Sequence, residues 1–344
     1  MATTLQINPL LIHQLLDQET LHEPGSPTAG KLPGNYVKTV LKNKNTLTPI
    51  IEKNNHMLTC KTCGKKGKYD VGMLVVNVDK KTKTDNISDN IQMTGYFRCK
   101  HCNSAGNWEL PNSILMQSMV SVLPYDNGLA KQSMVGKNLL FDGSWHRYTT
   151  DAEDYLLDKL KGNPQDSYVW NRLGNLYHKG NRPDLAVSVF EHSISLDQGQ
   201  AESHFTIGSM LSQISDLPNA GYHFRQMLLV AEKYKKMPAE DLREMLANGL
   251  WLLFMMHDHT NGEVPFAPTA DEIQGSGRGE VPVDFAEMEL EIFPEDVESF
   301  FPLAEMYMGT RAKEIPIRKR TFKLTTSTTS FRKKKKRVKK KKKK

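Results

Sequence analysis

The chain has 344 residues, of which 38% are hydrophobic, and a formal net charge of +7. This length predicts two or three domains, and the apolar content is sufficient for their cores. No segment approaches the roughly 18 consecutive apolar residues of a membrane-spanning helix, and the N-terminus has no basic region followed by an apolar stretch, so we expect a cytoplasmic protein. The charge is uneven, because residues 332–344 carry twelve lysines and arginines and the rest of the chain has a net charge of −5.

Residues 1–55 predict an N-terminal helix and a linker. Four leucines fall on one face of a short amphipathic helix: Leu10, Leu11, Leu15 and Leu16. Proline and glycine then recur between Pro24 and Gly34, which is typical of a connecting segment.

All four cysteines of the chain belong to two Cys-x-x-Cys pairs, Cys60/Cys63 and Cys99/Cys102. One tetrahedral Zn²⁺ takes four soft, deprotonated ligands, and two such pairs supply them. Gly64 and Asn103 follow the two pairs, and both residue types tolerate the positive φ that a tight turn requires. We therefore predict that the four thiolates bind one structural Zn²⁺, with no position left for a substrate.

The segment between the two pairs predicts a β-hairpin. Val71 to Val78 is an apolar, β-branched run, and Met93 to Phe97 leads into the second pair, so both favour strands. Asp79 to Asn90 is polar and predicts the loop between them. With the pairs brought together in this way, residues 56–110 resemble the zinc-ribbon family with an elongated hairpin.

Three alternatives remain open for the cysteines. A thioredoxin-type redox site would make the protein an oxidoreductase, but such a site uses one Cys-x-x-Cys at the start of a helix. Disulfides are less expected in a reducing cytosol. His101, which lies inside the second pair, is a candidate ligand in place of one cysteine.

Residues 111–150 predict a connector, and residues 151–260 predict a helical domain. In the connector, Ser113 to Val122 favours a short helix, and Trp145 and Tyr148 indicate some packing.

The helical domain contains an internal repeat. One set of residues has the spacing of two helices that face each other across the turn at 180–183: Trp170, Leu173, Gly174, Tyr177, Ala186 and Phe190. The same spacing recurs further along the chain: His204, Ile207, Gly208, Leu211, Ala220 and Phe224. The small residues let the helices approach closely, and the large residues fill the space beside them.

This pattern resembles the tetratricopeptide repeat (TPR) family, whose members repeat with the same period that separates Trp170 from His204. The resemblance covers about residues 152–234 and extends loosely to residue 258. The first repeat departs from the family pattern at Gln198, where a proline is usual, and the second lacks both aromatic residues of the first helix. Because about three repeats are needed for a stable array, we expect the helices at 151–161 and 239–258 to cap it.

The resemblance implies a groove that binds a segment of a partner protein and is lined by the first helix of each pair. The candidate groove residues are Asn171, Asn175, His178, Phe205, Ser209 and Ser212. The alternative for each residue is an ordinary solvated helix face. The groove has little basic character, which departs from the family members that grip a C-terminal carboxylate.

Residues 261–310 predict an acidic loop with a short helix, and residues 311–344 predict a basic, disordered tail. The polylysine tail is expected to bind polyanions by counterion release, through residues that include Arg332, Lys333, Lys334, Lys335, Lys336 and Arg337. Nucleic acid, a ribosome, an anionic membrane surface or the chain's own acidic segment 263–305 would each serve as the partner.

No motif for nucleotide binding or nucleophilic catalysis is present, so we do not expect an enzyme. His257 and His259 are a weak metal-site candidate at a helix end. We expect a non-enzymatic adaptor with an unidentified protein partner; the alternative is a nucleic-acid- or ribosome-associated protein that contacts polyanions through the zinc module and the tail. Loss of zinc is expected to unfold residues 56–110 and to leave residues 152–258 folded.

Overall fold

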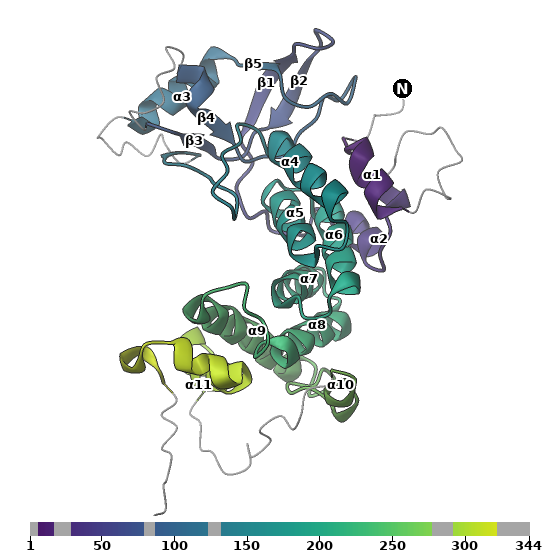
Figure 1. Cartoon of the computed structure of the whole chain (residues 1–344), viewed down its shortest axis with the longest axis vertical. Helices are drawn as coiled ribbons and strands as arrows, with labels where there is room; N and C mark the ends of the chain where they lie inside the picture. Colours follow the sequence, from purple (N-terminus) through teal and green to yellow (C-terminus); the bar gives the residue numbers. More distant parts are fainter. Residues whose placement is uncertain (1–5, 17–28, 79–86, 123–131, 277–291, 322–344) are drawn as a thin grey trace, which may run out of the picture.

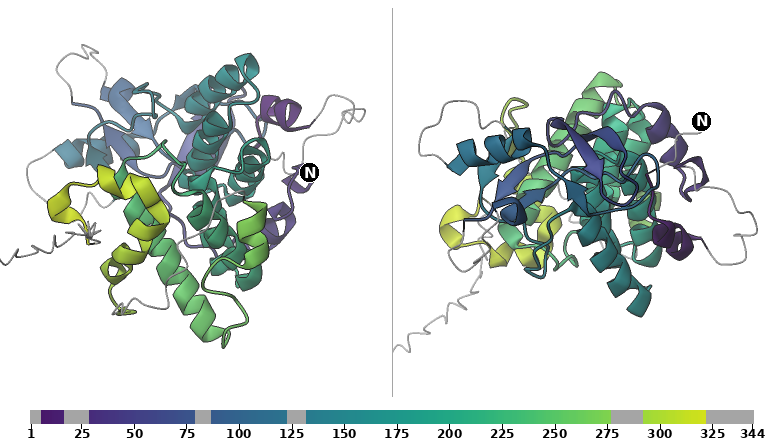
Figure 2. Two further views of the ribbon diagram at one scale, coloured as in Figure 1. Left: turned by 60° about the horizontal axis from the view of Figure 1, so that its bottom comes forward. Right: turned by 90° about the horizontal axis from the view of Figure 1, so that it is seen from above.

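Two small sheets lie at one end of a row of packed helices (Figure 1). The computed structural model describes residues 6–16, 29–78, 87–122, 132–276 and 292–321. The predicted α+β class is confirmed. The right-hand view of Figure 2 shows the same arrangement from the sheet end, with the helices behind the strands. Among the described residues, no helix has both the length and the apolar character needed to cross a membrane.

The first sheet carries the first cysteine pair at its hairpin turn. Its strands are antiparallel in the order β2-β1-β5: β1 (Asn55–Cys60), β2 (Lys66–Asp70) and β5 (Trp108–Glu109). Leu58 and Tyr69 are buried, whereas Met57 and Lys68 are exposed. Sequence reasoning missed these strands because only one side of each is apolar and no continuous apolar run marks them.

The second sheet contains the predicted hairpin in shorter form. Its order is β4-β3-β6, with β3 antiparallel to β4 and parallel to β6: β3 (Leu74–Val76), β4 (Ile91–Met93) and β6 (Ser133–Val135). The predicted strand over Met93 to Phe97 is wrong beyond its first residue. At Gly95 the chain presses against other backbone, since a Cβ there would lie 2.3 Å from Asp70 O, and it then turns out of the sheet.

The segments around this sheet follow the sequence expectation in part. The helix predicted in the connector is present as α3 (Asn112–Val122) and packs against β6 and β3. Of the predicted loop, residues 79–86 lie outside the described residues, and Ile87–Asn90 forms the 3₁₀ turn η3. Tyr148 is buried, as expected, while Trp145 remains 36% exposed.

The helical array consists of two hairpins of helices between two flanking helices. Their bounds are α4 (Thr149–Gly162), α5 (Ser167–Lys179), α6 (Pro183–Leu196), α7 (Ala201–Gln213), α8 (Leu217–Val230) and α9 (Ala239–His259). Helix α5 packs on α6 and α7 on α8, and α4 and α9 cover the two ends (Figure 1). The predicted helices and their order are confirmed.

The two hairpins repeat the same turn at the offset that the sequence predicts. In the first, Arg182 N donates to Tyr177 O, and in the second, Asp216 N donates to Leu211 O, both at 2.9 Å. Asn181 and Ser215, at matching positions, have φ angles of 60° and 63°. The repeat is therefore present in the backbone as well as in the apolar pattern.

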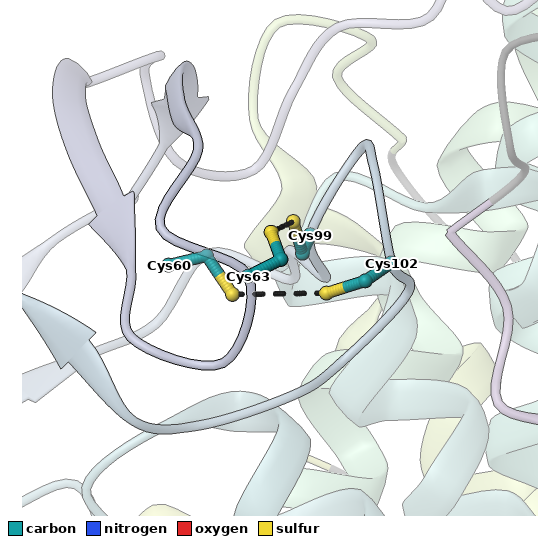
Figure 3. Close-up of side chains that lie close together, drawn as sticks. All are labelled: Cys60, Cys63, Cys99 and Cys102. Atoms are coloured by element: carbon teal, nitrogen blue, oxygen red, sulfur yellow. Dashed lines mark hydrogen bonds between the residues drawn. The ribbon is translucent and has the colours of Figure 1, made fainter.

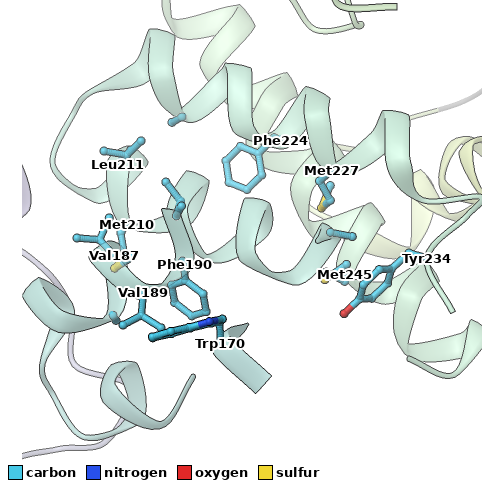
Figure 4. Close-up of a cluster of buried hydrophobic side chains, with 14 of the residues drawn as sticks. Trp170, Val187, Val189, Phe190, Met210, Leu211, Phe224, Met227, Tyr234 and Met245 are labelled. Carbon is cyan, nitrogen blue, oxygen red and sulfur yellow. The ribbon is translucent and has the colours of Figure 1, made fainter. Parts of the chain in front are cut away.

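The core of each hairpin is a phenylalanine ring packed on a glycine. Phe190 and Phe224 are fully buried, together with Trp170 (Figure 4). A Cβ placed on Gly174 would lie 2.5 Å from the Phe190 ring, and one on Gly208 would lie 3.1 Å from the Phe224 ring. Glycine at these two positions sets how closely the helices approach.

The alanine substitutions at these glycines should therefore differ. Gly174→Ala is expected to lower the free energy of unfolding by about 1–3 kcal/mol, because overpacking outweighs the helix-propensity gain of ~1 kcal/mol. For Gly208→Ala the two effects should nearly cancel. Gly162→Ala is the control, because nothing lies within 4 Å of its added Cβ. Urea titrations followed by circular dichroism measure all three, and equal effects at Gly174 and Gly208 would contradict the close-approach argument.

The N-terminal segment packs along the second helices of the array. Helix α1 (Pro9–Leu15) contacts α4, and α2 (Val37–Lys42) contacts α6, with Leu11 and Val40 fully buried. Between them, residues 17–28 lie outside the described residues, and Ala29–Lys31 forms the 3₁₀ turn η2. Glu191 on α6 accepts a hydrogen bond from Asn35 N at 2.7 Å. The second half of the expected linker is therefore part of the packed structure.

The C-terminal elements close the other end of the array. They are α10 (Ala270–Gly275), α11 (Phe301–Met308) and the 3₁₀ turns η5 (Val297–Phe300), η6 (Gly309–Glu314) and η7 (Ile317–Lys319). Helix α11 packs on α9, and the buried Arg311 donates to the carbonyls of Tyr234 and Met237. The disorder expected over residues 311–344 is wrong for residues 311–321, because this contact orders them, and the remainder lies outside the described residues.

A buried carboxylate joins the cysteine-bearing end to the helices. Glu153 on α4 is fully buried and accepts hydrogen bonds from Tyr96 Oη at 2.9 Å and Tyr177 Oη at 2.6 Å. It also forms an ion pair with Arg98 at 2.9 Å. Loss of hydration and the nearby carboxylate raise the pKa of both tyrosines well above the usual value, so both remain donors. Tyr96 N also donates to Gly180 O at the α5–α6 turn.

Two buried histidines face each other between α7 and α8. His204 Nδ1 and His223 Nδ1 are 3.0 Å apart, and the Tyr36 ring at the start of α2 packs edge-on against His223. Burial lowers the pKa of His204 to about 4. Burial, with a smaller contribution from His204, lowers the pKa of His223 well below the usual value. Both rings are therefore neutral at neutral pH.

Acidification should destabilise the protein through this pair. The unfolded chain binds protons at these histidines below about pH 6.5, whereas the lowered pKa values keep both rings neutral in the folded chain, His204 until the pH nears 4, so stability is lost as the pH falls through this interval. Between pH 7.5 and 5.0 the loss should be about 2 kcal/mol from His204, and His223 should add to it in the same direction. Urea midpoints at several pH values measure it, and a His204→Gln/His223→Gln variant should show a shallower dependence. An unchanged slope in that variant would rule out this pair as the source.

Candidate metal centre and helical groove

Two loops with the same backbone geometry present the cysteines. In the first loop Gly64 N donates to Cys60 O at 2.8 Å, and in the second Asn103 N donates to Cys99 O at 2.9 Å. The amide of each leading cysteine also donates to the carbonyl five residues later. Gly64 and Asn103 have φ angles of 71° and 58°, so the positive φ predicted after each pair is confirmed.

The four sulfur atoms form a compact cluster (Figure 3). Cys60 Sγ lies 3.8 Å from Cys102 Sγ, and Cys63 Sγ lies 3.6 Å from Cys99 Sγ. All four sulfurs lie within 4.8 Å of one another. Sulfurs at the corners of a tetrahedron around Zn²⁺, each about 2.3 Å from the metal, are about 3.8 Å apart, whereas disulfide sulfurs are about 2.05 Å apart. The spacing fits one tetrahedral ion, and the cysteines are free thiols.

The ligand set consists of cysteine alone. In the described part of the chain, these four residues are the one group of three or more metal-ligating side chains. His101 does not belong to it: its side chain is exposed, while its backbone amide donates to Cys99 Sγ at 3.4 Å. Neither pair begins a helix, which is the place of the pair in thioredoxin-type sites. The chemistry of the cluster therefore fits a closed site for a soft or borderline metal ion.

A hydroxyl that sequence reasoning missed bridges the two pairs. Ser104 Oγ lies 3.1 Å from both Cys60 Sγ and Cys102 Sγ. Burial opposes ionisation of Cys60, but hydrogen bonds, the Ser104 hydroxyl first among them, outweigh it and lower the pKa of Cys60 to about 6. The same hydroxyl lowers the pKa of Cys102. Such a donor supports the thiolate form that binds metal. Only the folded loop identifies this serine, since its position in the sequence carries no motif.

Five of the six predicted groove residues are half-exposed on the first helices of the two hairpins: Asn175 and His178 on α5, and Phe205, Ser209 and Ser212 on α7. The sixth, Asn171, is fully buried, and its Nδ2 donates to Ser203 Oγ at 2.8 Å. Asn171 therefore holds α5 to α7 and is not available to a partner. The tail candidates, residues 332–337, lie outside the described residues.

A charged cluster on the same two helices was not predicted. Arg172 on α5 forms an ion pair with Glu202 on α7, and Tyr234 Oη donates to Glu202 at 2.5 Å. The Arg172 guanidinium stacks on the Tyr168 ring, 4.7 Å from its centroid. These contacts fix the two first helices side by side. No local motif links the two charged residues, which belong to different hairpins, so the sequence alone does not reveal the pair.

The weak metal-site candidate at the end of α9 has a structural role. His257 Nδ1 lies 2.8 Å from Val264 O, in the turn that follows the helix. This contact links the His257 side chain at the end of α9 to the turn that follows the helix.

No protein-family model matches this chain, and a search of curated proteins finds no significant match. Function is therefore inferred from the geometry of the cysteine cluster and of the helices.

Metal loss should weaken the helices as well as the sheets, because Tyr96 and Arg98 precede the second pair and both bind Glu153 on α4. The purified protein should contain one metal ion per chain, and Cys60→Ser should lose it. We expect the helical circular-dichroism signal of this variant to melt at a lower temperature than that of the intact protein. Elemental analysis and thermal melts check both statements.

Ser104→Ala is the matched control for metal loss. It should keep the ion but with about tenfold weaker affinity in a chelator competition, because the ligands remain and only their hydrogen-bond partner is lost. Helical melting that is unchanged in Cys60→Ser would show that the cysteine-bearing region and the helices fold independently, as the sequence alone suggests.

Proposed function

We propose that this protein is a non-enzymatic adaptor, in which a structural zinc ribbon is fixed to a TPR-like helical array that binds a segment of a partner protein. The observation that carries the proposal is the repeated hairpin. Its two turns share the same hydrogen bond and the same positive φ at matching positions of the repeat, and each hairpin pairs a glycine with a phenylalanine. Arrays of this kind present the first helix of each pair as an extended binding surface.

The exposed face of these first helices suits a peptide. Phe205 is half-exposed and packs edge-on against Phe224, which leaves part of its ring for an apolar side chain of a ligand. Asn175 and Ser212 lie on the same two helices and offer an amide and a hydroxyl. Arg172 and Glu202 neutralise each other, so this face has little net charge and does not select a strongly charged ligand.

Zinc is the metal that best fits the cluster. Four thiolates at tetrahedral spacing suit Zn²⁺, and a site closed by four protein ligands has no position for a substrate. We therefore assign the ion a structural role: it holds two loops that lack a large core of their own.

An alternative function is polyanion binding, in which the ribbon and the tail contact nucleic acid or a ribosome. It is favoured by four exposed lysines around the first cysteine loop: Lys61, Lys65, Lys66 and Lys68. The same lysines also offset the negative charge of a metal tetrathiolate. Salt distinguishes the two functions, because polyanion binding weakens steeply with salt and peptide binding to a neutral helix face does not.

Site-specific photo-crosslinking in cells tests the adaptor function. Benzoylphenylalanine at Ser209 or Ser212 should give a discrete protein adduct, because both positions are partly exposed on α7. The control is the same group at Ser195, which is exposed on the second helix α6.

The position of the adducts decides the outcome. Adducts at the α7 positions and not at Ser195, retained after nuclease treatment, support the adaptor function. Equal adducts at all three positions, or adducts that disappear with nuclease, contradict it and favour the polyanion alternative.

A further inference from the structure

A cleft of about 700 Å³ lies beside the α5–α6 turn. One wall is the segment of residues 41–53, which leads from α2 to β1, and the opposite wall is the turn itself, residues 178–184. Lys100, from the second cysteine loop, and Gln213, at the end of α7, also line the cleft. The volume is in the range of sites that hold a ligand of the size of a short peptide.

The cleft wall is held in place by specific hydrogen bonds. Asn181 Nδ2 donates to Ile51 O at 3.2 Å, and Gln213 Oε1 accepts from Thr48 N at 2.8 Å. Both side chains, one from the α5–α6 turn and one from the end of α7, bind the backbone of the segment of residues 41–53. The cleft is thus built by contacts between parts of the chain that are far apart in the sequence.

The lining carries a net positive charge, because four cationic side chains share it with one carboxylate, that of Asp184. Arg182 and Asp184 neutralise each other, with 2.8 Å between Arg182 Nη2 and Asp184 Oδ2. Three lysines remain: Lys44, Lys53 and Lys100. Among the described residues, no carboxylate lies within ion-pair distance of these three ammonium groups; Lys100 Nζ donates only to a carbonyl, that of Lys68.

The rest of the lining is aliphatic and polar. Leu41, Leu47 and Ile50 face the cleft, and its one ring is the imidazole of His178. Burial lowers the pKa of His178 to about 4, so the ring is neutral at neutral pH and can donate one hydrogen bond. Proteins that bind single-stranded nucleic acid add, to the attraction of their basic groups for phosphate, aromatic rings on which the bases stack, and beyond His178 this cleft offers none.

We propose that this cleft binds an acidic peptide segment of a partner protein, with carboxylates at the lysines and aliphatic side chains against Leu41, Leu47 and Ile50. The proposal does not depend on the neutral face of α5 and α7 and adds a second, charged contact to the adaptor. The two surfaces share one predicted residue, His178, which lies at the end of α5 and lines the cleft.

Fluorescence anisotropy with the full chain tests the proposal. The probe is a labelled peptide in which glutamates alternate with leucines, at physiological salt. Lys44→Glu/Lys53→Glu should weaken its binding about tenfold or more, because two attractions become repulsions. Both lysines are exposed, so the fold should be unaffected. Lys38→Glu/Lys161→Glu carries the same charge change at exposed positions outside the cleft and should stay within about twofold of the unmodified chain.

Two further probes give the remaining outcomes. A peptide with glutamine in place of every glutamate should not bind measurably. A single-stranded oligonucleotide of equal charge should bind both double variants alike, through the tail they share. The proposal is overturned if the acidic peptide binds both double variants equally, or if the oligonucleotide rather than the peptide loses affinity in Lys44→Glu/Lys53→Glu. Neither outcome bears on crosslinking at Ser209, so the adaptor function is tested separately.

Discussion

The arrangement of this protein depends on the hydrogen bonds and the ion pair of one buried carboxylate, that of Glu153. A charge removed from water is stable only when paired and hydrogen-bonded, and leaving one partner of a buried pair alone typically costs about 3–5 kcal/mol. Here the partners come from both parts of the molecule: Arg98 and Tyr96 from the cysteine-bearing end, and Tyr177 from α5. Separating the cysteine-bearing end from the helices would expose the Glu153 carboxylate to water or leave it buried without its partners. These contacts therefore favour one arrangement of the two parts.

This contact changes the meaning of the cysteine cluster. Arg98 immediately precedes Cys99, and its Nε also donates to Asn103 O within the second loop. The loop that carries the second cysteine pair is thus the loop that reaches Glu153. A metal ion that fixes this loop would also fix the position of the Arg98 guanidinium. The proposed metal site would therefore stabilise the small cysteine-bearing region and also the attachment of that region to the helices.

The sequence predicts what short-range patterns determine. Cysteine spacing identified the four residues of the cluster, and the repeated helical pattern placed the helices and their turns, because each depends on neighbours within one hairpin. The short strands β1 and β2 were missed, since most of their residues are exposed or only partly buried and no apolar run marks them. Ser104, the pair of Arg172 with Glu202, and the burial of Asn171 also depend on chain segments that meet only in the fold.

The segment between α2 and β1 explains why the two proposed binding surfaces differ in chemistry. It starts on α6, is held over the α5–α6 turn by Asn181 and Gln213, and ends in the strand that leads to Cys60. Helix α2, which precedes the segment, packs on the second helix α6, while on the first helices the charges of Arg172 and Glu202 neutralise each other. Because the segment brings Lys44 and Lys53 to the turn where Lys100 arrives from the metal loop, positive charge collects in the cleft and not on that face. A partner that engages both surfaces would be held in a fixed direction along the array, with its acidic part toward the metal centre.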